Sequence, residues 1–135
     1  MKLLMIYCEE FGFTPTLKTL SDAPDAEPAH ITDAVVGFIH VEPGDMERSR
    51  KVTTKLVKHL KWLAGKNGTR RIVLHSFAHL GEAKAEPTAG REILQQAQER
   101  LETAGYEVWQ TPYGHFNDLI IQAPGHPLAR VYQEF

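Results

Sequence analysis

The sequence has one cysteine, no long apolar run and no large excess of charge of one sign. Cys8 has no partner for an internal disulfide, which favours a reducing, cytoplasmic compartment. No apolar run approaches the ~20 residues of a membrane helix, so no membrane partner is expected. The apolar start of the chain ends at Cys8 and is too short for a signal peptide. The formal net charge of −2 gives no indication of tight wrapping around nucleic acid.

Several motifs of common enzyme classes are also missing. The chain has no paired cysteines and no His-Glu-x-x-His, and His75 and His79 flank a turn rather than share a helix face, so a metal is only a minor alternative. Ser76 lies in no Gly-x-Ser-x-Gly motif, and no phosphate-binding loop is present. We therefore expect no metal and no cofactor. Cys8 is expected to be an inert core residue.

The 135 residues are enough for one domain, and 42% of them are hydrophobic, as a folded core requires. Charge is distributed unevenly along this domain, residues 1–135. Seven acids and no Lys or Arg lie between Lys18 and Arg48, whereas nine Lys or Arg and no acid lie from Arg48 to Arg71. The basic segment is either a solvated helix face or a contact surface for a polyanion, and the first is the usual explanation of a charge run.

Runs of β-branched and aromatic residues predict five strands, over Lys2–Cys8, Ala34–Val41, Ile72–Leu74, Tyr106–Gln110 and His115–Ala123. Phe11, Phe13 and Leu17 predict a separate extended segment after the first strand, interrupted by Gly12 and Pro15. Ser21–His30 reads as a loop and Leu128–Phe135 as a short terminal segment.

Two apolar stripes with a period of three and four residues predict helices. Asp45 is expected to cap a helix from Met46 to about Ala64, and Pro87 to open a second helix that ends near Ala104. Alternation of strands and helices gives a single α/β domain with two main helices. Hairpin-like joints near both ends add antiparallel strands, so the predicted sheet is mixed.

The central strand, Ile72–Leu74, leads into a turn that carries His75, Ser76, Phe77 and His79. Ligands of α/β proteins bind where strands end, and His and Ser are residues with catalytic chemistry. The same residues are equally typical of a polar loop that caps a sheet. The residues alone leave both interpretations open.

Two stretches carry a resemblance to a known family. One is Ser76-Phe77-Ala78-His79-Leu80 followed by Lys84-Ala85-Glu86-Pro87-Thr88, and the other is Thr111-Pro112-Tyr113-Gly114-His115-Phe116-Asn117 followed by Gly125-His126-Pro127-Leu128-Ala129. With the opening strand, they resemble the archaeal-type N-terminal editing domain of threonyl-tRNA synthetase, in matching order and spacing over nearly the whole chain.

The resemblance implies a fold like that of D-aminoacyl-tRNA deacylase, a homodimer, and hydrolysis of Ser wrongly attached to threonine tRNA. Thr and Ser differ by one methyl group, which changes binding by only about 1–3 kcal/mol, so a second, editing pocket is useful. The implied partners are the 3′ end of tRNA(Thr) and a threonyl-tRNA synthetase catalytic module. In this family the terminal ribose of the tRNA is thought to orient the attacking water, so no conventional nucleophile is needed.

The resemblance also implies site residues. His79, His115 and Asn117 are the expected catalytic residues, with the backbone of Phe77 and Ala78 beside the seryl group. Val41 and Tyr113 are expected to pack against the terminal adenosine, and Phe116 to line the reacting end. A plain core role is the alternative for Tyr113 and Phe116.

The chain departs from the family at two places. The family typically has a Tyr-Lys pair where this chain has Phe116-Asn117, and an acid where it has Arg130, counted here with the substrate-binding residues. These changes alter the charge of the site. Two alternatives to Ser removal therefore stay open: a tRNA-binding, nucleotide-binding or dimerisation module without catalysis, and a deacylase for another ester such as a D-aminoacyl ester.

Overall fold

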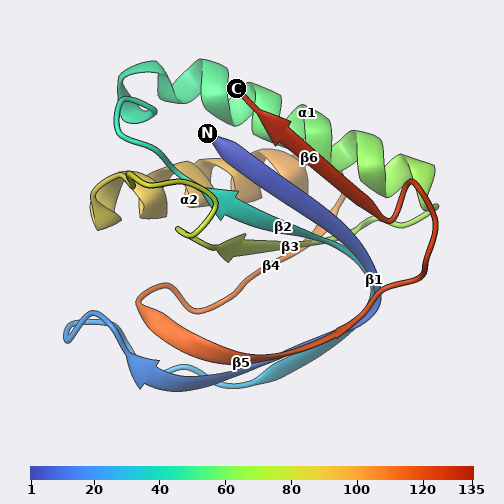
Figure 1. Cartoon of the computed structure of the whole chain (residues 1–135), viewed down its shortest axis with the longest axis horizontal. Coiled ribbons are helices and arrows are strands. Elements are labelled where there is room, and N and C mark those ends of the chain that lie inside the picture. Colours follow the sequence, from blue (N-terminus) through green and yellow to red (C-terminus); the bar gives the residue numbers. More distant parts are fainter.

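The computed structural model describes residues 1–135 and contains six strands, two long helices and one short 3₁₀ helix (Figure 1). Their bounds are β1 Lys2–Lys18, β2 Ala29–His40, η1 Met46–Arg48, α1 Ser49–Lys66, β3 Arg71–Ser76, α2 Pro87–Thr103, β4 Glu107–Gln110, β5 His115–Gln122 and β6 Arg130–Glu134. Neither long helix is apolar over enough of its length to cross a bilayer.

All six strands form one mixed sheet, as predicted. The strand order is β4-β3-β2-β1-β5, and β6 also pairs with β1. The β2–β3 and β3–β4 pairs are parallel, and α1 and α2 are the crossovers between them. The pairs of β1 with β2, β5 and β6 are antiparallel. Both helices cover the same face of the sheet (Figure 1).

The first strand is longer than predicted, and the separation into two segments was wrong. β1 runs without a break through Gly12 and Pro15. Its pairing with β2 ends at Phe13, so Pro15 lies where the strand has no β2 partner that needs its missing N–H. A register shift against β5 follows between Pro15 and Lys18. Figure 1 shows β1 curving from the helix-covered half of the sheet to a second half that it shares with β5.

Other predicted boundaries shift by a few residues, and β3 extends through His75 and Ser76, which were expected in the turn after it. β2 begins at Ala29, inside the predicted loop, because its first residues pair with the extended second half of β1. The terminal segment, for which no element type was predicted, contains β6, which pairs with the first half of β1.

Asp45 does not cap a helix, which corrects the prediction. Residues 46–48 form the 3₁₀ helix η1, and α1 starts at Ser49 with no side-chain cap. The buried Asp45 carboxylate instead accepts hydrogen bonds from the Glu42 N–H at 2.8 Å and from the amino group of Met1 at 3.2 Å. Asp45 therefore stabilises the position of the amino terminus and not the first turn of a helix.

The two ends of the chain meet at this place. The Met1 amino group also contacts Glu42 Oε1 at 2.7 Å and donates to the Phe135 carbonyl at 2.8 Å. Hydrogen bonds from Lys2 and from the Met1 amino group lower the pKa of Glu42 to about 2.

Two apolar clusters lie on opposite faces of the sheet. The larger contains 18 buried residues and joins both helices to the sheet. The smaller contains eight and fills the concave side, where the two halves of the sheet face each other. Successive residues of β3 alternate between them, with Ile72 and Leu74 in the first and Val73 in the second. Cys8 belongs to the smaller cluster and is fully buried, as predicted, and burial raises its pKa to about 11.

Candidate functional site

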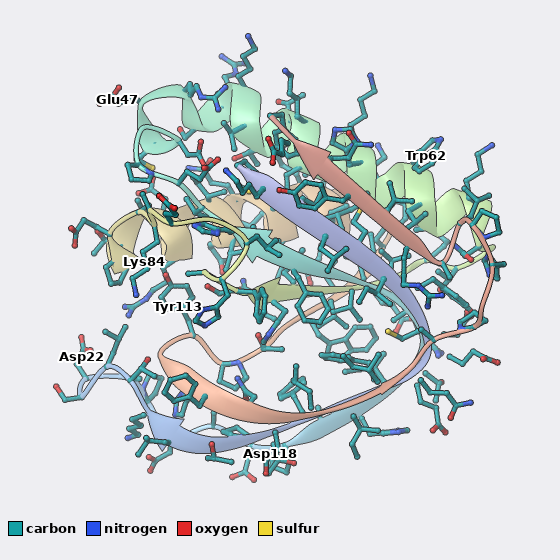
Figure 2. The ribbon with its side chains drawn as sticks, viewed as in Figure 1. Asp22, Glu47, Trp62, Lys84, Tyr113 and Asp118 are labelled. Carbon is teal, nitrogen blue, oxygen red and sulfur yellow. The ribbon has the colours of Figure 1, made fainter.

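A cleft of about 690 Å³ lies where β3 ends, between the loop that follows β3, the start of α2 and the first residues of β5. This volume is within the usual range for small-molecule sites. No residue of α1 lines the cleft, so the basic segment on this helix is interpreted as a solvated face. Figure 2 shows Lys84 and Tyr113 near each other on the cleft side, and Trp62 of α1 well apart from both.

Eight of the nine site residues expected from the sequence line this one cleft: Val41, Phe77, Ala78, His79, Tyr113, His115, Phe116 and Asn117. Arg130 does not. It lies on β6 beside Ile6 of β1, and its guanidinium contacts the Pro124 carbonyl at 3.3 Å. The structure therefore brings together residues from positions 41 to 117. Arg130, the second position at which the chain departs from the family, lies outside the cleft.

The loop that carries His79 is fixed at both ends. The Phe77 N–H donates to the Ile39 carbonyl at 2.9 Å, and the Leu80 N–H donates to His40 Nδ1 at 3.1 Å. Because Nδ1 accepts, His40 carries its proton on Nε2, which donates to the Ala83 carbonyl at 2.7 Å. His40 is fully buried, so these two hydrogen bonds hold the loop to β2.

Between these two anchors, the N–H groups of Ala78 and His79 donate no hydrogen bond within the protein. Both residues line the cleft, and His79 is exposed, with its ring edge-on to Phe77 at 5.1 Å between centroids. Two adjacent N–H groups held in a fixed loop are suitable donors for an oxygen that gains negative charge during a reaction.

The opposite wall of the cleft is β5. His115 and Asn117 are two residues apart and therefore point to the same side of the strand. His115 Nδ1 and Asn117 Oδ1 are buried and have no hydrogen-bond partner within the protein. Buried polar atoms are rarely unpaired, so these two are candidates for ligand contacts. Phe116 also borders the cleft, but its side chain is 56% exposed.

Tyr113 stands beside the first turns of α2. A Cβ atom at Gly90 would lie only 2.6 Å from the Tyr113 hydroxyl oxygen, so the absence of a side chain at Gly90 makes room for this ring. The Arg91 guanidinium lies 5.2 Å from the ring centroid, within the range of a cation–π contact. Tyr113 is thereby positioned by α2 as well as by its own turn.

The deep end of the cleft contains residues that the sequence did not identify as a pair. Five lining residues are buried: Ile39, Val41, His75, Gly90 and Thr111. His75 Nδ1 lies 2.8 Å from Thr111 Oγ1. His75 stood out in the sequence only as part of the turn after the central strand, and no pattern marked Thr111, because the contact joins positions 36 residues apart.

The charge of the cleft is one-sided. Its lining includes Lys18 and Lys84 but no Asp, Glu or Cys. Lys18 is paired with Asp25 at 2.8 Å, whereas Lys84 is exposed and makes no ion pair. The cleft thus offers imidazoles, amide groups and a free cation, and it suits an anionic ligand whose reaction needs hydrogen-bond donors more than a carboxylate base.

Comparisons with known proteins agree with this picture. The family model described as the archaea-specific editing domain of threonyl-tRNA synthetase matches residues 1–135. Threonine–tRNA ligase of Methanopyrus kandleri is 31% identical over 133 residues, which cover 97% of this chain and 21% of the ligase. The ligase of Thermococcus kodakarensis is 28% identical over 135 residues, covering 97% of this chain and 22% of the ligase. The chain thus spans about a fifth of the length of these curated relatives.

Among solved structures, the c-Myc DNA Unwinding Element Binding Protein superimposes with a TM-score of 0.70 at 11% sequence identity, covering 100% of this chain and 99% of that one. At this identity the likeness concerns the fold alone. The predicted fold, a single α/β domain with a mixed sheet of the D-aminoacyl-tRNA deacylase-like type, is confirmed.

Proposed function

The chain belongs to the family of archaea-specific editing domains of threonyl-tRNA synthetase, and on this premise we propose that it hydrolyses the ester bond of Ser mischarged to tRNA(Thr). Such proofreading is needed because a synthetic site built for Thr rejects Ser poorly, since the two differ by one methyl group. A second site that is too small or too polar for the methyl group removes the error.

One observation carries the proposal: a single cleft holds the free N–H groups of Ala78 and His79 opposite the unpaired atoms of His115 and Asn117. An ester hydrolase needs donors for the developing oxyanion and polar groups that orient the attacking water. The loop supplies the first and β5 supplies the second.

In the proposed reaction, a water oxygen bonds to the ester carbonyl carbon, and the carbonyl oxygen becomes an oxyanion that the two N–H groups stabilise. The C–O bond to the terminal ribose then breaks, the ribose oxygen takes the proton that the attacking water gives up, and free Ser and uncharged tRNA leave. His79, His115 and Asn117 orient the water together with the ribose hydroxyl of the substrate. No covalent enzyme intermediate is needed, and the lining residues include no Cys or carboxylate nucleophile.

The remaining lining residues have roles in binding the tRNA end. Val41 and Tyr113 pack against the terminal adenosine, and Phe116 borders the reacting end. Lys84, exposed and without an ion-pair partner, offers a cation to the phosphate backbone. Arg130 lies outside the cleft, so any contact that it makes to tRNA is with a part of the molecule beyond the reacting end.

The test is deacylation of Ser-tRNA(Thr) by the purified protein and by His79→Ala and Asn117→Ala. Each substitution removes a polar group at the reacting end, so we expect each rate to fall at least about tenfold. His126→Ala, in an exposed turn outside the cleft, is the matched control and should keep the wild-type rate. A wild-type rate equal to that of buffer hydrolysis rejects the proposal.

A second candidate is a module that binds the tRNA end without hydrolysis. The uncharged Asn117 on β5, where the family typically has Lys, favours it. Binding of tRNA without turnover of any ester would establish this alternative, and hydrolysis of D-aminoacyl esters but not of the Ser ester would establish a deacylase with a different substrate. A panel of charged tRNAs, tested on wild type and on Asn117→Lys, separates these outcomes.

We extend the proposal to the assembly of the protein. β5 is an edge strand that pairs only with β1 and exposes Phe116 and Ile120, the latter to 62%. An exposed apolar edge strand favours association, and we propose a homodimer through this strand. Sedimentation at micromolar concentration should give twice the mass of the chain, and Ile120→Lys should give the monomer. A monomeric wild type rejects the dimer.

The other proposed partner is a threonyl-tRNA synthetase catalytic module in the cytoplasm.

A further inference from the structure

A buried polar pair lies next to the apolar cluster on the concave side of the sheet. His75 is 7% exposed and Thr111 is 5% exposed, and they are joined by the 2.8 Å contact between Nδ1 and Oγ1. The His75 ring lies edge-on to Phe38 at 5.0 Å between centroids and beside Phe77 at 5.9 Å. Polar groups in such surroundings are unfavourable unless they make hydrogen bonds, so the presence of this pair calls for a role.

The other ring nitrogen of His75 faces the cleft. Nε2 has no hydrogen-bond partner in the protein and is not fully buried. Because His75 lines the cleft, a ligand in the cleft can reach this atom. Among the five buried lining residues, only His75 and Thr111 have polar side-chain atoms. The buried part of the cleft therefore presents one free polar atom, His75 Nε2, beside the rings of Phe38 and Phe77.

We propose that His75, oriented by Thr111, is a specificity-determining residue that hydrogen-bonds the side-chain hydroxyl of a small aminoacyl group at the deep end of the cleft. This inference rests on the proposed ester hydrolysis and assigns a contact to that site. The oxyanion donors are on the His79 loop, and the tRNA end enters past exposed residues such as Lys84. The aminoacyl side chain is the part of the substrate small enough for the buried end.

Three features make His75 suitable for this contact. The contact with the Thr111 hydroxyl occupies Nδ1, so Nε2 is the ring nitrogen left for a ligand. The aromatic neighbours Phe38 and Phe77 restrict rotation of the ring. Burial lowers the pKa of His75 to about 4, so the ring is neutral at physiological pH and demands no counter-charge from the substrate.

The contact predicts a preference based on the hydroxyl. A site built to hydrogen-bond a substrate hydroxyl rejects an analogue that lacks it much more strongly than an apolar pocket does, because the buried polar group is then left unpaired. A Ser ester should therefore be preferred over an Ala ester, although Ala is smaller. A cleft that selects by size alone would accept both.

The test uses two non-hydrolysable ligands, the 3′-seryl amide and the 3′-alanyl amide of 3′-amino-3′-deoxyadenosine, and measures their binding to wild type and His75→Phe by calorimetry. We expect wild type to bind the seryl amide at least about tenfold more tightly than the alanyl amide. His75→Phe keeps a ring of similar size and should bind both amides equally, with alanyl-amide affinity within about twofold of wild type. Thr111→Val leaves the imidazole in place but frees its orientation, and should show an intermediate preference.

The outcomes separate this inference from the proposed function. Deacylation of Ser-tRNA(Thr) by wild type, together with an unchanged seryl preference in folded His75→Phe, overturns the role of His75 and leaves the hydrolysis intact. If His75→Phe does not fold, an unchanged preference in Thr111→Val overturns it. Binding of neither amide by wild type also overturns the role of His75, and the deacylation assay alone decides the hydrolysis. As a direct readout, the imidazole nitrogen resonances of His75 should shift with the seryl amide and remain in place with the alanyl amide.

Discussion

On the helix side of the sheet, the 18 residues of the larger apolar cluster join α1 and α2 to the strands, and the buried Thr53 of α1 is hydrogen-bonded to Gln96 of α2. On the concave side, the cluster has eight residues and its open end holds His75, Thr111 and the unpaired atoms of His115 and Asn117. The same strands build both sides, since alternate residues point to opposite faces. The helix side therefore contributes mainly stability, although Ile39 and Val41 of its cluster border the cleft, and the unpaired polar atoms of the cleft lie on the concave side.

This division has a physical basis. A closed apolar layer gains free energy from every buried methylene, whereas a cleft keeps polar atoms in low-dielectric surroundings at a cost to stability. Substitutions on the two sides should therefore change different quantities.

The largest effect is expected on the helix side. Leu60 is fully buried in α1, and Leu60→Ala should lower the free energy of unfolding by about 2–5 kcal/mol through lost burial and the cavity that remains. Denaturant titration measures this change. Leu119→Ala, at a half-buried position that lines the cleft, is the matched substitution and should cost less stability while weakening seryl-amide binding. Weaker binding by folded Leu60→Ala would break the division.

The next effect is a dependence of stability on pH that originates on the concave side. The folded-state pKa of His75, about 4, lies below its ordinary value of 6.5, so the unfolded state binds more protons between these values. Stability is complete above about pH 6.5 and falls as the pH drops toward 4. His75→Phe removes this term and should gain on the order of 3 kcal/mol relative to wild type between pH 7 and 4. Urea unfolding at both pH values measures the gain.

Glu42 at the meeting point of the chain ends supplies the matched control in another pH window. Its pKa is lowered from 4.5 to about 2, so its stabilising contribution is present above pH 4.5 and is lost as the pH falls toward 2. The stability difference between wild type and Glu42→Gln should be constant from pH 7 to 5 and shrink below pH 5.

For His75, the contradicting outcome is a difference in unfolding free energy between wild type and His75→Phe that does not vary between pH 7 and 4. Such a result contradicts the burial of a neutral imidazole.

The smallest effect on stability is expected at Gly90. Ala at this position favours the helix by up to about 1 kcal/mol but forces the Tyr113 hydroxyl to move. Gly90→Ala should therefore leave the free energy of unfolding nearly unchanged and weaken seryl-amide binding severalfold. Gly65→Ala in α1 meets no atom within 4 Å and should stabilise without changing the affinity. Equal affinities for the two variants would remove Tyr113 from the binding surface.

Much of the fold was predictable because it depends on local patterns. The stripes of α1 and α2 and the apolar runs of β2 and β3 gave the two helices, the parallel core of the sheet and the turn after β3. The start of the chain was not predictable in this way. Gly12 and Pro15 have the properties of strand breakers, but β1 continues because its partners change along its length, from β2 and β6 at the start, to β2 and β5, and finally to β5 alone. Pairing partners are not encoded locally.

The residues of the candidate site also fall into a group that the sequence predicted and a group that it did not. The motifs around His79 and Tyr113 predicted residues that do meet in one cleft, since their spacing matches a known family. The pairing of His75 with Thr111, the anchoring of the loop by His40 and the use of Asp45 at the amino terminus were not predictable, because each joins residues that only the fold brings together. A helix-cap pattern at Asp45 was misleading, since a nearby ammonium competes more strongly for the carboxylate than a backbone N–H does.

The contact between the Met1 amino group and the Phe135 carbonyl has a practical consequence for engineering. A peptide fused ahead of Met1 converts a charged donor into a neutral amide and must leave through a space enclosed by Glu42 and Asp45. A circularly permuted form that joins the two ends needs only a short linker, but it sacrifices the positive charge that both carboxylates share.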